Sequence, residues 1–119
     1  MTPVNLRQKL NLFSDHWNPR IVGELNGQQV RLAKFQGEFV WHAHENEDEL
    51  FLVLDGSFEM HFRDRVVAVR EGEFLIVPKG VEHRPFAAEE VSVLLFEPAA
   101  IQHTGSVKSH FTRTELEKI

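Results

Sequence analysis

Residues 41–56 read WHAHENEDELFLVLDG. The run from Leu50 to Leu54 is apolar without a break, and Asp55-Gly56 closes it with a turn signal. An apolar run this short, bounded by turn residues, is typical of a β-strand that is covered on both faces, because a buried helix would need more residues. The segment therefore predicts a buried strand between an acidic link and a tight turn.

The rest of the chain repeats this pattern of short apolar runs between turns. Residues 57–63 alternate, so Phe58, Met60 and Phe62 are expected on one buried face. Residues 74–77 are apolar throughout and are expected to be covered on both sides. Further strands are predicted at 31–35, 39–44, 66–70 and 91–97. About eight short strands with tight connections favour an all-β fold, with a closed or sandwiched antiparallel sheet.

The N-terminal segment departs from this β pattern. Between residues 5 and 13, Leu6, Leu10 and Phe13 recur at helical spacing. Asn5 stands where a helix N-cap is expected, since its side chain can accept a hydrogen bond from the first turn. A short helix over residues 5–13 is therefore predicted to pack over one end of the barrel.

The C-terminal segment is polar, and the chain as a whole has the size of one domain. We expect residues 1–119 to form a single domain with a barrel core at about 20–97. Residues 102–119 form a polar tail in which Thr112 and Glu115 have capping-box spacing. The tail therefore predicts at most a short terminal turn of helix.

Composition and charge argue against several function classes. The 119 residues carry a formal net charge of −5, so the surface would repel phosphates and no nucleic-acid partner is expected. No apolar stretch approaches the length of a membrane span, and residues 1–10 lack a signal-peptide core. The sequence therefore predicts a cytoplasmic protein with no membrane partner.

Because the chain has no Cys, nitrogen and oxygen must hold any metal.

A pair of histidines precedes the buried strand. His42 and His44 are two residues apart, so on a strand both side chains project to the same side and can meet at one point. Glu49 follows after the acidic link, at the start of the returning strand, where its carboxylate can face the two imidazoles. Neutral imidazole and carboxylate are ligands that transition metals accept.

A second segment supplies another candidate ligand. Residues 72–83 read GEFLIVPKGVEH, which is a strand, a Pro-Gly turn and then a single histidine, His83. A third imidazole is thus available from a distant part of the chain. Three nitrogens and one oxygen would leave open positions for water or substrate on a five- or six-coordinate ion.

At these residues the chain resembles the cupin family, and in particular its small single-domain bacterial members. The first cupin motif, G…H-x-H…E…G, is matched by Gly37, His42, His44, Glu49 and Gly56. The second motif, G…P-x-G…H…N, is matched by Gly72, Pro78, Gly80 and His83. Two departures are present. The gap from Gly37 to His42 is one residue shorter than is usual in the family, and Ala87 stands where the second motif usually has Asn.

The resemblance implies a fold and a metal site. The fold is a double-stranded β-helix, which is a jelly-roll-like barrel. The site would hold one divalent transition metal ion (Fe, Mn, Zn, Ni or Cu) on His42, His44, Glu49 and His83. Motif spacing favours Glu49 over the acidic neighbours Glu45, Glu47 and Asp48.

The alternative for the histidine pair His42 and His44 is a surface hairpin that carries polar side chains by chance. We interpret the other histidines as surface or interface residues: His16, His61, His103 and His110.

Three function classes remain open on the sequence. Cupin relatives include dioxygenases, isomerases and decarboxylases, so the resemblance implies a small-molecule enzyme with an unassigned substrate. The alternatives are a non-catalytic metal-dependent module that binds or senses a small molecule, and a structural barrel with a vestigial site. Glu45 and Glu47 are candidate general bases, with solvated turn residues as an equally good interpretation.

The expected partners are a small molecule and a second copy of the chain. With ten Phe and no Tyr, the interior is expected to be apolar, which favours a small, partly apolar substrate. Arg84, beside His83, is the positive charge that could reach a carboxylate. Small barrels can pair through an edge strand or a terminal segment, so a homodimer is predicted.

Overall fold

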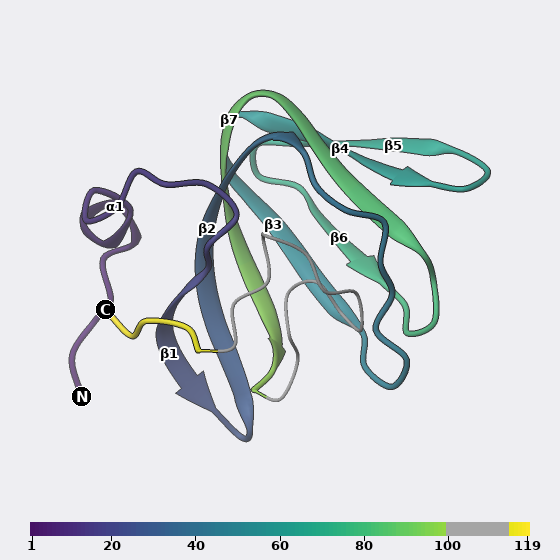
Figure 1. Ribbon diagram of the computed structural model, residues 1–119. Helices are drawn as coiled ribbons and strands as arrows, with labels where there is room; N and C mark the ends of the chain where they lie inside the picture. The colour runs from purple at the N-terminus through teal and green to yellow at the C-terminus, as the bar shows by residue number, and fades with distance from the viewer. Residues whose placement is uncertain (100–114) are drawn as a thin grey trace.

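The computed structural model describes residues 1–99 and 115–119, and β-strands make up most of it (Figure 1). Its elements are, in chain order, α1 (Leu6–Leu10), β1 (Arg20–Leu25), β2 (Gln28–Glu38), β3 (Glu49–Asp55), β4 (Ser57–Phe62), β5 (Val66–Arg70), β6 (Phe74–Val77) and β7 (His83–Pro98). Each pairing between these strands is antiparallel. The predicted all-β fold class is confirmed.

The long strand β7 joins the two layers of the barrel. Its C-terminal half lies between β2 and β3, in a sheet of order β1-β2-β7-β3-β6. Its N-terminal half pairs with β4, which in turn pairs with β5. Because β7 bends from one layer into the other (Figure 1), the inward side chains of both layers meet in a single interior. This arrangement is the predicted jelly-roll-like barrel.

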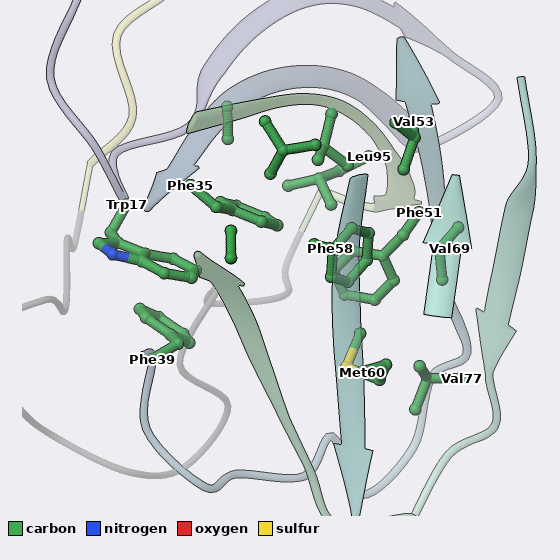
Figure 2. Packing of buried hydrophobic residues seen from close by; sticks show 14 residues of the cluster. Trp17, Phe35, Phe39, Phe51, Val53, Phe58, Met60, Val69, Val77 and Leu95 are labelled. Carbon is green, nitrogen blue, oxygen red and sulfur yellow. The ribbon is translucent and has the colours of Figure 1, made fainter. Parts of the chain in front are cut away.

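Aromatic and aliphatic side chains fill that interior (Figure 2). Trp17, from the segment before β1, stacks against Phe35 and Phe39 with ring centroids 4.4 and 4.6 Å apart. On β4 the predicted alternation is confirmed for Phe58 and Met60, which are 3% and 0% exposed. Burial of such side chains removes apolar surface from water and is the main stabilising contribution to the barrel.

The strand predicted at 39–44 is wrong. Residues 39–48 form a loop whose one bridge joins His42 to His83, with hydrogen bonds of 3.0 and 2.9 Å between their backbone groups. Gly37 has a positive φ (83°) and follows a register shift, but pairing with β7 resumes at Gly37 and Glu38, and the strand ends after Glu38. Beyond it the Phe39 N–H donates to the Pro85 carbonyl at 3.0 Å, so the loop runs beside the start of β7 without forming a regular strand.

The expectation that residues 74–77 are covered on both sides is also wrong. Phe74 and Ile76 are 62% and 50% exposed, whereas Val77 is buried and Leu75 packs against the core. Side chains alternate across β6, so only one of its faces points into the barrel, and the outer face with Phe74 and Ile76 is left exposed. An unbroken apolar run in the sequence therefore does not by itself show that both faces of the strand are covered.

The N-terminal helix forms in the predicted segment, but it is shorter, and the expectation that it packs over one end of the barrel is wrong. The Asn5 side chain accepts a hydrogen bond from the Gln8 backbone N–H at 3.0 Å, which confirms the N-cap. The helix ends at Leu10, and Leu10 and Phe13 pack on Leu32 of β2, on the outer side of the sheet. Among the described residues no helix is long and apolar enough to cross a bilayer.

The last residues of the chain lie beside β1. Ile21 donates a backbone hydrogen bond to the Glu117 carbonyl at 2.9 Å, and the Ile119 N–H donates to the Ile21 carbonyl at 3.0 Å. Residues 115–119 are therefore extended and not helical. The rest of the tail predicted at 102–119, including Thr112 of the predicted capping box, lies outside the described residues.

The turn between β3 and β4 requires glycine. Gly56 has φ +91°, and a Cβ there would lie 3.0 Å from the Glu90 carbonyl oxygen and 3.3 Å from the Val91 Cα. We expect Gly56→Ala to destabilise the fold by about 2–4 kcal/mol, because strain in the left-handed region adds to a backbone clash. Gly27→Ala is the matched control, since Gly27 has φ +76° with open space around it. Equal losses for the two variants in urea unfolding would contradict the clash.

Candidate metal centre

The four predicted ligands converge inside one end of the barrel. His42 and His44 come from the loop 39–48, Glu49 is the first residue of β3, and His83 is the first residue of β7. One ligand atom from each lies within 4.8 Å of the others. The four residues are 3%, 7%, 2% and 0% exposed, respectively. Such a cluster of three imidazoles and a carboxylate could hold a metal ion.

Backbone carbonyls orient two of the imidazoles. The His42 Nδ1–H donates to the Val40 carbonyl at 2.9 Å, and the His83 Nδ1–H donates to the Val81 carbonyl at 2.9 Å. A hydrogen bond at Nδ1 leaves Nε2 as the ring's electron-pair donor and limits rotation of the ring. The carbonyl two residues earlier thus prepares each of these histidines to coordinate through Nε2.

Three of the four candidate ligands present a buried atom that has no hydrogen bond. His44 Nε2, Glu49 Oε1 and His83 Nε2 are fully buried and unpaired. Glu49 Oε1 lies 3.2 Å from His44 Nε2 and 3.7 Å from His83 Nε2. Leaving buried polar atoms unsatisfied costs free energy, so such a group requires an explanation. A divalent cation would satisfy all three atoms at once, and the donor set fits one.

The surroundings of His42 and Glu49 favour the protonation states that coordination needs. Burial, together with the neighbouring His83, lowers the pKa of His42 to about 3, so its ring is neutral at physiological pH. Burial alone would raise the pKa of Glu49, but Glu97 and the adjacent histidines hold it well below the usual value. Metal ligands must be deprotonated to bind, and these two are.

Sequence reasoning missed two charged residues behind the ligands. Arg31 and Glu97 are each 1% exposed. The sequence placed them only at the ends of the predicted strands 31–35 and 91–97 and gave them no role in the site. Arg31 Nη1 donates to Glu97 Oε1 at 2.5 Å. Burial and the neighbouring Glu49 raise the pKa of Glu97 well above its usual value. Strand alternation could have indicated the burial of Arg31, because Arg31 is two residues from Ala33 and therefore lies on the same inward face of β2.

The candidate general bases lie in the loop at the barrel end. Glu45 is exposed, as a solvated turn residue would be. Glu47 is partly exposed and lines, together with Glu49, an open surface groove of about 570 Å³. Of the two candidate bases, Glu47 therefore lines the same groove as the candidate ligand Glu49.

Arg84 lies away from the ligand cluster. Its guanidinium is 5.1 Å from the centroid of the Trp41 ring, 3.1 Å from His61 Nδ1 and 3.8 Å from Glu38 Oε1. His61 also contacts Glu59, at 3.0 Å, so it points away from the barrel interior as predicted. Arg84 therefore contributes no charge to the apolar cavity beside the cluster, and the expectation that it reaches a substrate carboxylate there finds no support.

The remaining histidines lie elsewhere or outside the described residues. His16 Nε2 is 2.7 Å from Glu90 Oε2 in an exposed pair. His103 and His110 lie outside the described residues. Neither the exposed pair nor His61 joins the ligand cluster.

A small apolar cavity adjoins the ligands. Its volume is about 20 Å³, which is room for about one water molecule. It is lined by Trp17, Pro19, Phe35, Phe39, His42, Glu49, Phe51, Pro85 and Leu95. The two polar side chains of this lining are ligands, so the space next to the candidate ion is otherwise hydrophobic.

Known proteins share both the sequence pattern and this architecture. Residues 28–97 match the Cupin domain family. A Bacillus subtilis protein described as "Uncharacterized protein YdbB" is 45% identical over 64 residues, which are 53% of this chain and 57% of that protein. The chain thus matches little more than half the length of this curated relative.

Two solved structures are similar over most of the chain. A cupin-2 domain containing protein from Shewanella frigidimarina is 44% identical, with a TM-score of 0.79, over 80% of this chain and 93% of that one. Protein NMB1881 from Neisseria meningitidis is 33% identical, with a TM-score of 0.76, over 82% of this chain and 100% of that one. Motifs, barrel and these similarities agree, and the chain belongs to the cupin domain family.

Proposed function

We propose that this cupin binds one divalent transition metal ion through His42, His44, Glu49 and His83, and that it acts on a small molecule there. The observation that carries the proposal is the group of buried, unpaired atoms His44 Nε2, Glu49 Oε1 and His83 Nε2. The proposed activity is that of a small-molecule enzyme of the dioxygenase, isomerase or decarboxylase type.

The surroundings of the cluster favour a small, partly apolar substrate. When bound, a metal ion of this kind supplies Lewis acidity or, for iron, a site for O₂ chemistry. The rings of Trp17, Phe39 and Phe51 line the adjoining cavity and make it apolar. No Lys or Arg is among the lining residues, so a phosphorylated substrate would meet no compensating charge there. With room for about one water molecule, the cavity must widen before a substrate enters.

Metal binding is expected to stabilise the protein. Each of Fe²⁺, Mn²⁺, Zn²⁺, Ni²⁺ and Cu²⁺ is added to chelator-treated protein, and thermal unfolding is followed by circular dichroism. An ion at about 100 times its Kd contributes about 2.7 kcal/mol, or roughly 10 °C in Tm for a domain of this size. An unchanged Tm with all five ions, together with a metal-free elemental analysis of protein purified without an affinity-column metal, would refute the proposal.

Oxygen consumption and product formation separate a dioxygenase, an oxygen-independent enzyme and a binding module from one another. A dioxygenase loaded with iron consumes O₂ with an aromatic or dicarbonyl compound, whereas an isomerase or decarboxylase works anaerobically and tolerates Mn, Zn or Ni. A sensing module shows ligand-dependent stabilisation without product. The homodimer and the cytoplasmic location stay predictions from the sequence.

A further inference from the structure

A row of buried polar side chains stands behind Glu49 on the inner face of the sheet. Gln29 and Glu97 are paired in register across β2 and β7, and Arg31 follows Gln29 on the same face of β2. The rest of that inner face is apolar, with Phe35 on β2 and Leu95 on β7. The polar end of the sheet therefore coincides with the ligand end of the barrel.

The contacts in this row lead from the barrel rim to Glu49. The Gln29 side-chain N–H donates to Glu24 at 3.3 Å, and Gln29 Oε1 accepts from Arg31 Nε and Nη2 at 3.0 and 2.8 Å. Arg31 Nη1 donates to Glu97 Oε1. Leu50 of β3 pairs with Phe96 of β7, so Glu49 lies opposite Glu97 on the buried face of the sheet, and Glu97 Oε2 is buried without a hydrogen bond.

Stability alone does not account for this row. Removing an arginine and a carboxylate from water costs several kcal/mol per ion, and apolar replacements of buried ion pairs are often neutral or stabilising. Arg31 and Glu97 are each 1% exposed, so the guanidinium and the carboxyl group are both removed from water. By contrast, carboxylate ligands of metals are commonly held by hydrogen-bonding neighbours, which set the orientation of the ligand.

We propose that Glu97, held by Arg31 and Gln29, is a positioning residue that orients the Glu49 carboxylate toward His44 and His83. The inference rests on the proposed metal site. Arg31 binds one oxygen of Glu97, so the other oxygen is directed at Glu49, and the carboxylate of Glu49 is prepared before an ion arrives. This arrangement reduces the reorganisation that coordination would otherwise require.

The test compares Zn²⁺ binding to the full chain and its Glu97 variants by calorimetric titration. Glu97→Ala is expected to weaken Zn²⁺ binding about 10- to 100-fold. Glu97→Gln keeps an oxygen that can accept from Arg31 and an N–H that can donate to Glu49, so it is expected to retain most of the affinity. Glu90→Ala is the matched control, because Glu90 is an exposed glutamate of the same strand and should leave the affinity unchanged.

A purely structural role would lower the Tm of Glu97→Ala without changing its Zn²⁺ affinity. Wild-type affinity in Glu97→Ala would therefore overturn the inference, as would a Glu97→Gln variant that binds as weakly as Glu97→Ala. If Glu97→Ala does not fold, the double variant Arg31→Met/Glu97→Leu decides, since it leaves no unpaired buried charge. We expect it to fold and to bind Zn²⁺ weakly, and wild-type affinity would refute the proposal. Failure of the wild-type protein to bind would instead refute the metal site itself.

Discussion

His83→Ala is expected to lower the affinity for the divalent ion by about 100-fold or more, because coordination loses one of three imidazoles and each ligand contributes a large share of the binding free energy. His83 is 0% exposed and is oriented by the Val81 carbonyl, so no neighbouring donor can take its place without moving the chain. Calorimetric titration with Zn²⁺ or Mn²⁺ measures the loss.

His61→Ala is the matched control for this experiment. His61 lies on the outer side of β4, between Glu59 and Arg84, and is not in the cluster of ligand atoms. We expect its removal to leave the metal affinity and the metal-induced rise in Tm unchanged. If His83→Ala bound the ion as well as His61→Ala does, the ligand set proposed for this barrel would be wrong.

The metal-free protein is expected to lose stability steeply as the pH falls below 6.5. His42 takes up a proton near its ordinary value of 6.5 in the unfolded chain, but only at about 3 in the folded chain. Between these values the unfolded state binds more protons, so the free energy of unfolding falls with falling pH. This group accounts for roughly 2 kcal/mol between pH 6.5 and 4.5, because the full slope of 1.36 kcal/mol per pH unit is reached only below pH 6.5.

His42→Gln isolates this contribution, because it removes the titrating ring and retains a polar side chain. Urea unfolding of both proteins in the presence of a chelator gives the free energy of unfolding at each pH. The difference between wild type and variant should shrink by roughly 2 kcal/mol over that interval, while the carboxyl groups of Glu49 and Glu97 contribute similarly to both proteins. Parallel pH profiles for the two proteins would show that His42 does not carry the effect.

Local patterns in the sequence predict the features whose causes are local. The N-cap at Asn5 depends on one side chain and the backbone three residues away, and it is found as expected. The alternation of Phe58 and Met60 follows from the period of a strand, and both are buried. The turn at Gly56 is formed by the residue type that a positive φ requires.

Features that depend on distant neighbours were predicted less well. Phe74 and Ile76 are exposed because the outer face of β6 is left uncovered, and which faces become covered is a property of the whole topology. The region 39–44 has strand-like composition, but beyond Glu38 it forms only an isolated bridge to the distant residue His83. Neither outcome can be read from residues near these positions.

By itself, the sequence determined an all-β barrel and identified four candidate ligands. Strand alternation, turn residues and motif spacing are all properties of the order of residues along the chain. The tertiary structure decided that the donor atoms of these ligands meet within 4.8 Å, and that Arg31 and Glu97 lie buried behind Glu49. The physical reason is that burial and the pairing of charges depend on which strands become neighbours. Gln29 and Glu97 are far apart in sequence, and only the antiparallel register of β2 and β7 brings them together.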